Sequence, residues 1–89
     1  MNYKDLKTVK MEIKVLGTGC PKCRALEKAT QEALGELEID ASLTKVEEIE
    51  KIMAYGIMRT PGLVINEKAV VSGRLPSKDE IKNLIIQNQ

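Results

Sequence analysis

The chain has 89 residues, of which 43% are hydrophobic and 30% charged, and this composition suits one small globular domain. Lys and Arg number 14 against 13 Asp and Glu, and the net charge of +1 gives no strong attraction to nucleic acid or anionic membranes. Tyr3 and Tyr55 are the only aromatic residues, too few for a set of base-stacking platforms. With no apolar run of membrane-spanning length and no secretory signal at the N-terminus, we predict a cytoplasmic protein.

We interpret residues 1–89 as one domain that begins with a polar leader over residues 1–9. Residues 11–16, MEIKVL, alternate apolar and polar side chains, and this two-residue period predicts a strand. Gly-Thr-Gly at residues 17–19 predicts a turn that ends the strand immediately before Cys20.

Pro21 follows Cys20, and proline is favoured in the first turn of a helix because its missing N–H has no helical partner there. Apolar side chains continue at helical intervals as far as Leu37, which predicts a long helix. A short second strand is expected around residues 41–43.

Thr44 and Glu47 have the spacing of a capping box and indicate the start of a second helix. Gly56 is expected to end it. The apolar residues that follow the box at helical intervals are Ile49, Ile52, Met53 and Ile57.

Two β-rich runs, GLVIN and KAVVSG, lie between residues 62 and 73, and residues 66–68 between them read as a hairpin turn. Ser77 and Glu80 form another capping-box pattern. It predicts a last helix that buries Ile81, Leu84 and Ile85.

The resulting order, β-α-β-α-β-β-α, predicts an α/β sandwich with a mixed four-stranded sheet covered by three helices. The first two strands should be parallel because a helix joins them. The last two should form an antiparallel hairpin.

GTGCPKC contains both cysteines, Cys20 and Cys23. Their spacing is compatible with a reversible disulfide or with a binding site for a soft metal ion, and it could also arise by chance. The position of the pair between a strand and a helix favours the redox-active disulfide. A structural zinc site needs four ligands, usually cysteine thiolates and histidine imidazoles. This chain has two cysteines and no histidine, so a single chain cannot complete such a site. Binding of Cu(I) by the two thiolates remains an alternative, because soft ligands select that ion.

The helix start gives the two sulfurs different predicted roles. Its partial positive charge favours a thiolate at Cys20, the expected nucleophile, and Lys22 adds positive charge nearby. Cys23, one turn further and shielded by the helix, is the expected resolving thiol. Pro21 is expected to stiffen the pair by fixing φ.

Cys-Pro-Lys-Cys at a strand-to-helix junction, together with Thr60-Pro61 before the hairpin, resembles the thioredoxin-fold superfamily. The pattern is most similar to the small glutaredoxin-like redox-active disulfide proteins of archaea and bacteria, over roughly residues 10–86. The resemblance implies a thioredoxin-like, glutaredoxin-type fold and a Cys20–Cys23 redox-active disulfide. It also implies a cis Thr60–Pro61 bond, with the backbone of Thr60 available to a bound substrate strand.

Three features depart from better-known members of this superfamily. Gly19 stands where thioredoxins commonly have tryptophan, and no acidic residue of the first strand matches their buried aspartate. The aspartate with which glutaredoxins bind glutathione is missing from VSGRLPS, although Gly73 is retained. Glutathione is therefore a doubtful reductant for this chain.

Arg59 is expected either to contact an acidic partner or the Cys20 thiolate, or to be a solvated loop residue. By analogy with the superfamily, Gly73 would lie near the substrate groove, and a plain turn is the alternative.

We therefore predict a thiol–disulfide oxidoreductase that reduces protein disulfides, in the manner of thioredoxins and glutaredoxins. It should act as a monomer, with no bound cofactor and no resident metal, and an upstream disulfide reductase should restore its thiols. The alternatives are a Cu(I) or other soft-metal carrier and a redox-sensing interaction module that uses the same cysteine pair.

Overall fold

The computed structural model describes residues 11–19 and 21–88, so the predicted polar leader over 1–9 and the nucleophile Cys20 lie outside the described residues. The elements follow the predicted order. They are β2 (Met11–Leu16), α2 (Pro21–Leu37), β3 (Ala41–Val46), α3 (Ile49–Ala54), β4 (Gly62–Ile65), β5 (Lys68–Ser72) and α4 (Lys78–Gln87).

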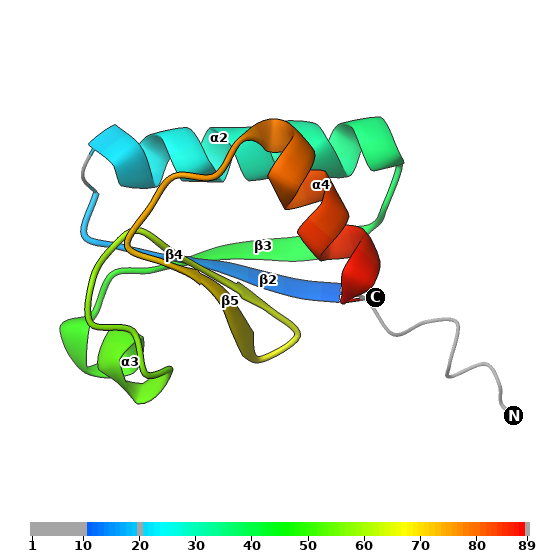
Figure 1. Cartoon of the computed structure of the whole chain (residues 1–89). Helices are drawn as coiled ribbons and strands as arrows, with labels where there is room; N and C mark the ends of the chain where they lie inside the picture. Colours follow the sequence, from blue (N-terminus) through cyan, green and yellow to red (C-terminus); the bar gives the residue numbers. More distant parts are fainter. Residues whose placement is uncertain (1–10, 20, 89) are drawn as a thin grey trace, which may run out of the picture.

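The four strands form one mixed sheet in the order β3-β2-β4-β5. β2 is parallel to β3 and antiparallel to β4, which is antiparallel to β5. Helices α2 and α4 cover one face of the sheet, and α3 lies against the other face (Figure 1). The predicted α/β fold class and mixed four-stranded sheet are thus confirmed.

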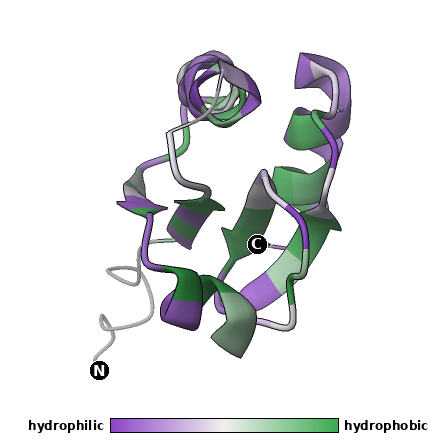
Figure 2. Ribbon diagram, turned by 90° about the vertical axis from the view of Figure 1, so that its left-hand side faces the viewer, coloured by the Kyte–Doolittle hydropathy of each residue, from purple (hydrophilic) through white to green (hydrophobic). Residues whose placement is uncertain are grey.

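Alternating side chains of the central strands fill two separate cores. Ile13 and Val15 of β2 point into the larger core, under α2 and α4, where they meet Leu26 and Ile81. Leu16 points to the other face and packs in a smaller cluster with Ile52, Ile57 and Val64. Viewed from the end where α2 begins, the apolar segments of the strands and helices lie between the layers (Figure 2). Because both of its faces are covered, β4 is buried at every position.

The predicted boundary between the second strand and the second helix is wrong. β3 continues to Val46, so Thr44 belongs to the strand and pairs with Lys14 of β2. Helix α3 begins only at Ile49, and its N-cap residue Glu48 makes no side-chain capping bond. Register with β2 therefore overrides the local capping-box pattern at Thr44 and Glu47.

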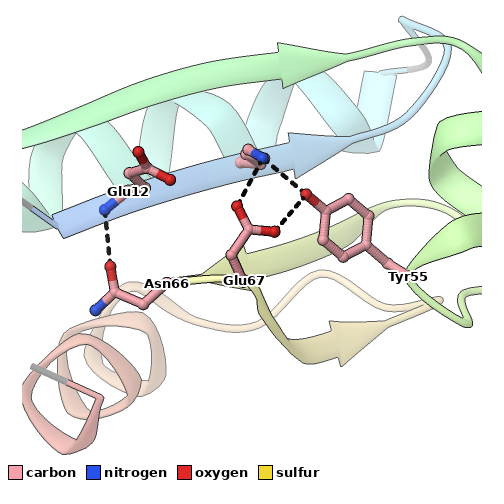
Figure 3. Close-up of polar contacts among 5 residues, drawn as sticks. Glu12, Tyr55, Asn66 and Glu67 are labelled. Carbon is pink, nitrogen blue, oxygen red and sulfur yellow. Dashed lines mark hydrogen bonds and ion pairs between the residues drawn. The ribbon is translucent and has the colours of Figure 1, made fainter.

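The hairpin turn between β4 and β5 is formed by Asn66 and Glu67, both with positive φ, 50° and 69°. Two central residues of this conformation match the right-handed twist of the flanking strands. The Asn66 side chain accepts a hydrogen bond from Glu12 N at 2.9 Å and donates one to Asn88 O at 3.0 Å. The bond to Glu12 fixes the turn to the start of β2 (Figure 3). The bond to Asn88 fixes it to the residue that follows α4.

The predicted cap of the last helix is present, because the Ser77 hydroxyl oxygen accepts a hydrogen bond from Glu80 N at 3.1 Å. Ile81 and Ile85 are buried, and Leu84 is partly buried against the larger core. No helix within the described ranges, 11–19 and 21–88, is long and apolar enough to cross a membrane.

Helices α2 and α4 are also joined by ion pairs, since Glu36 of α2 contacts both Lys78 and Lys82 of α4. Hydrogen bonds from Lys78 first, and then from Lys82, lower the pKa of Glu36 from its ordinary 4.5 to about 2. The lowered pKa means that the charged carboxylate favours the folded state.

This linkage predicts how stability depends on pH. The contribution of Glu36 is present above pH 4.5 and is lost as the pH falls through that value toward 2. Glu36→Gln should therefore lower the urea midpoint at pH 7, and the midpoints of the variant and the parent should converge near pH 2. The difference between the two urea midpoints at pH 7 should become smaller at high salt, because the ion-paired side chains are partly exposed to solvent. Glu12→Gln, at an exposed position of β2, is the control and should leave the pH dependence unchanged; an equal gap at pH 7 and pH 2 would contradict the linkage.

Candidate active site

The site begins where β2 passes into α2. Gly17 N donates a hydrogen bond to Val46 O at 3.0 Å, which holds the carboxyl ends of β2 and β3 together. Gly19 has φ of +90°, a conformation that favours glycine, and α2 begins two residues later at Pro21. Pro21 and Lys22 are exposed, as expected of a helix tip. Cys23 faces inward with 5% of its surface exposed.

Gly17 is the point at which the separate parts of the site meet. A Cβ atom added to Gly17 would overlap Cys23 Sγ and would lie 3.0 Å from Cys23 Cβ. The same added atom would lie 3.8 Å from Thr60 Cβ. A side chain at position 17 is therefore excluded, and the backbone there lies in contact with Cys23 and close to Thr60.

The Thr60–Pro61 peptide bond is cis, the conformation that the resemblance implies. Pro61 is buried, whereas Thr60 is exposed. The Pro61 carbonyl accepts a hydrogen bond from Gly73 N at 2.9 Å, which joins the segment before β4 to the end of β5. The structure thus brings three predicted site residues, Cys23, Thr60 and Pro61, to one end of the sheet.

Arg59 and Gly73 lie together on the flank of this segment. A Cβ added to Gly73, whose φ is +77°, would lie 3.0 Å from Arg59 Cβ, so the arginine stem packs over the glycine. The Arg59 side chain is exposed. The residue after Gly73, Arg74, makes two hydrogen bonds to the Glu80 carboxylate and therefore points toward α4.

An apolar pocket of about 290 Å³ lies on the α3 side of the site. Ile49, Met53 and Met58 contribute to it although they are 62%, 56% and 86% exposed. Of the residues of the six-residue α3, Ile52 is the buried one, so Ile49 and Met53 remain open to solvent although they recur at helical intervals. The pocket is lined by Thr18, Ile49, Ile52, Met53, Ile57, Met58 and Thr60.

A second pocket, of about 320 Å³, reaches Cys23 from the side of α2 and β3. It is lined by Val15, Gly17, Gly19, Cys23, Arg24, Glu27, Lys45 and Glu47. Glu27 of α2 and Lys45 of β3 form an ion pair there, with Lys45 Nζ 3.8 Å from Glu27 Oε1. Sequence reasoning missed these charged residues, since only the tertiary fold brings β3 beside the start of α2.

A polar cluster also fixes the end of α3, as Figure 3 shows. Lys14 Nζ donates to Tyr55 Oη at 2.7 Å and to Glu67 Oε2 at 3.1 Å, and Tyr55 Oη donates to Glu67 Oε1 at 3.0 Å. Tyr55 and Glu67 raise the pKa of Lys14, and Lys14 in turn lowers the pKa of Glu67. Tyr55 therefore packs its ring against the smaller core and uses its hydroxyl group in this polar cluster, a role that the sequence did not reveal.

Residues 11–86 match the family described as the thioredoxin domain. A protein named thioredoxin from Methanothermobacter thermautotrophicus is 41% identical over 75 residues, which cover 84% of this chain and 97% of that protein. A thioredoxin from Methanocaldococcus jannaschii is 38% identical over 74 residues, covering 83% of this chain and 85% of its own. The solved structure of a mutant thioredoxin from Halobacterium salinarum is similar, with a TM-score of 0.67 and 26% identity, and the match covers 98% of this chain and 85% of that one.

The fold and the candidate site thus define a small α/β protein with a buried cysteine in the first turn of its first described helix. The chain belongs to the thioredoxin domain family. This membership supports thiol–disulfide exchange as its general chemistry.

The contact at Gly17 gives a prediction with a matched control. Gly17→Ala should destabilise the protein by roughly 1–3 kcal/mol, because the new methyl group forces Cys23 to move. Gly35→Ala, in the last turn of α2 with nothing within 4 Å of the added Cβ, should instead stabilise it, by up to about 0.5–1 kcal/mol. Urea unfolding of both variants checks this, and a neutral Gly17→Ala would show that Cys23 is not confined there.

Proposed function

We propose that this protein is a thiol–disulfide oxidoreductase that reduces protein disulfides through Cys20 and Cys23. The observation that carries the proposal is the position of Cys23, buried at the start of α2 against Gly17, whose backbone also lies close to Thr60. Membership of the thioredoxin domain family supports the same chemistry.

In this proposal Cys20 attacks first. It precedes a 17-residue helix whose N–H groups and partial positive charge favour a thiolate at its start. The exposed cations of Lys22 and Arg24 act in the same direction. The Cys20 thiolate forms a bond to one substrate sulfur, the substrate S–S bond breaks, and the other substrate sulfur leaves as a thiolate.

Cys23 then resolves the mixed disulfide. Its thiolate attacks Cys20 Sγ, the bond between Cys20 and the substrate breaks, and the second substrate sulfur leaves with the electron pair. The substrate disulfide has gained two electrons and the cysteine pair has lost two. An upstream disulfide reductase returns them, and the protein needs no bound cofactor for this cycle.

The substrate would lie across Thr60 and the apolar pocket. Thr60 is exposed beside the site, and an extended segment can pair with such backbone while its side chains enter neighbouring pockets. Exposed Ile49, Met53 and Met58 offer an apolar side chain of the substrate a place next to Thr60. Arg59, packed over Gly73, would contact the flanking part of the segment.

Single-cysteine variants test the two sulfur roles. Cys20→Ser should abolish formation of a mixed disulfide with a protein substrate, because the attacking thiolate is gone. Cys23→Ser should accumulate that mixed disulfide, since nothing resolves it. Mass spectrometry of the intact protein after reaction with insulin checks both outcomes, and accumulation in Cys20→Ser instead would reverse the assignment.

The apolar pocket gives a prediction about substrate size. Met58→Glu should lower kcat/KM for insulin by about 10-fold, equivalent to roughly 1.4 kcal/mol, because an apolar contact is lost and a charge is desolvated. Reaction with a small aromatic disulfide should change little. Ile86→Glu is the control, because Ile86 is also exposed, at 51%, but belongs to α4 and does not line the pocket. Equal losses in both variants would exclude the pocket as the docking surface.

A further inference from the structure

The resolving thiol faces a chemical difficulty that the fold itself creates. Cys23 is 5% exposed, and burial disfavours the charged thiolate. Only the thiolate attacks a disulfide, so Cys23 must lose its proton when it attacks the mixed disulfide. A nearby group that accepts this proton would speed the step at neutral pH.

The 320 Å³ pocket brings such a group beside Cys23. Glu27 lies four residues after Cys23 in α2, a spacing that places two side chains on one helix face with Cβ atoms about 5–6 Å apart. Its side chain is only 25% exposed. The pocket has room for several water molecules, which can carry a proton between groups not in direct contact.

Lys45 fixes this carboxylate from the opposite wall. Its Nζ lies 3.8 Å from Glu27 Oε1, across the gap between β3 and α2. The remaining charged residues of the pocket are Arg24, from α2, and Glu47, from the segment after β3, and both are exposed. β2 contributes uncharged Val15 to the wall. Glu27 is thus the carboxylate that shares a helix face with Cys23 and is held in place by a counter-ion.

We propose that Glu27 accepts the proton of Cys23 in the resolving step, with Lys45 as the residue that positions its carboxylate. The inference rests on the proposed function. Water in the pocket carries the proton from Cys23 Sγ to Glu27, and the Cys23 thiolate forms the bond to Cys20 Sγ. The bond between Cys20 and the substrate breaks, and the leaving sulfur takes the proton from Glu27 or from solvent. Glu27 finishes the cycle as a carboxylate.

Reduced protein mixed with excess 5,5′-dithiobis(2-nitrobenzoate) separates the two steps. The first release of thionitrobenzoate reports attack by Cys20 and depends on reagent concentration. The second reports attack by Cys23 on the mixed disulfide and does not depend on it. Both phases are measured from pH 5 to pH 10 for the parent and its variants.

In Glu27→Gln the second phase should be about 10-fold slower or more near pH 6–7, while the first is unchanged. The deficit should shrink as the pH is raised toward 10, because hydroxide then removes the proton without help from Glu27. Glu27→Asp should restore part of the rate. Glu32→Gln, the same change at an exposed position of α2 outside the pocket, should behave like the parent.

Three results would overturn part of this account, each in a different way. If Glu27→Gln leaves the second phase unchanged, Glu27 has no part in the step. If it accelerates that phase at neutral pH, Glu27 is only a negative charge that opposes the thiolate, and the proton-acceptor role is wrong. If the parent itself shows no concentration-independent second phase, the proposed resolving role of Cys23 fails, and the inference fails with it.

Discussion

The close approach of the β2–α2 turn to Cys23 is the constraint on which the candidate site depends. Because Gly17 has no side chain, the sulfur of Cys23 can occupy the space beside the backbone, and Thr60 can approach the same point from another part of the chain. The bond from Gly17 N to Val46 O fixes that backbone to β3. A rigid sheet edge, not a mobile loop, therefore positions the sulfur.

The two faces of the sheet are covered to different extents, and the two sides of the candidate site differ accordingly. Two helices of 17 and 10 residues close one face, bury most of the core and anchor Cys23. The six-residue α3 closes only part of the other face and leaves Ile49, Met53 and Met58 in contact with solvent. We infer that chemistry belongs to the well-packed side and recognition to the sparsely covered side.

Sequence reasoning reached the fold because periodicity, caps and turns agreed along most of the chain. The alternation in residues 11–16, the proline after Cys20 and the Ser77 cap each specify local structure. It failed at Thr44, where pairing with Lys14 in the sheet outweighed a capping pattern. It also missed the contacts of Gly17 with Cys23 and of Glu27 with Lys45, because these join residues that only the packing of α2 on the sheet brings together.

The cluster of Lys14, Tyr55 and Glu67 makes the position of α3 depend on pH. A helix as short as α3 cannot hold its shape unaided, so its end relies on the hydrogen bonds of Tyr55 (Figure 3). Protonation of Glu67 would remove its ion pair with Lys14 and weaken the hydrogen bond that it accepts from Tyr55, although Lys14 and Tyr55 shift this protonation to a more acidic pH than usual. Strong acid would therefore loosen the end of α3, the helix that carries the exposed side chains of Ile49 and Met53.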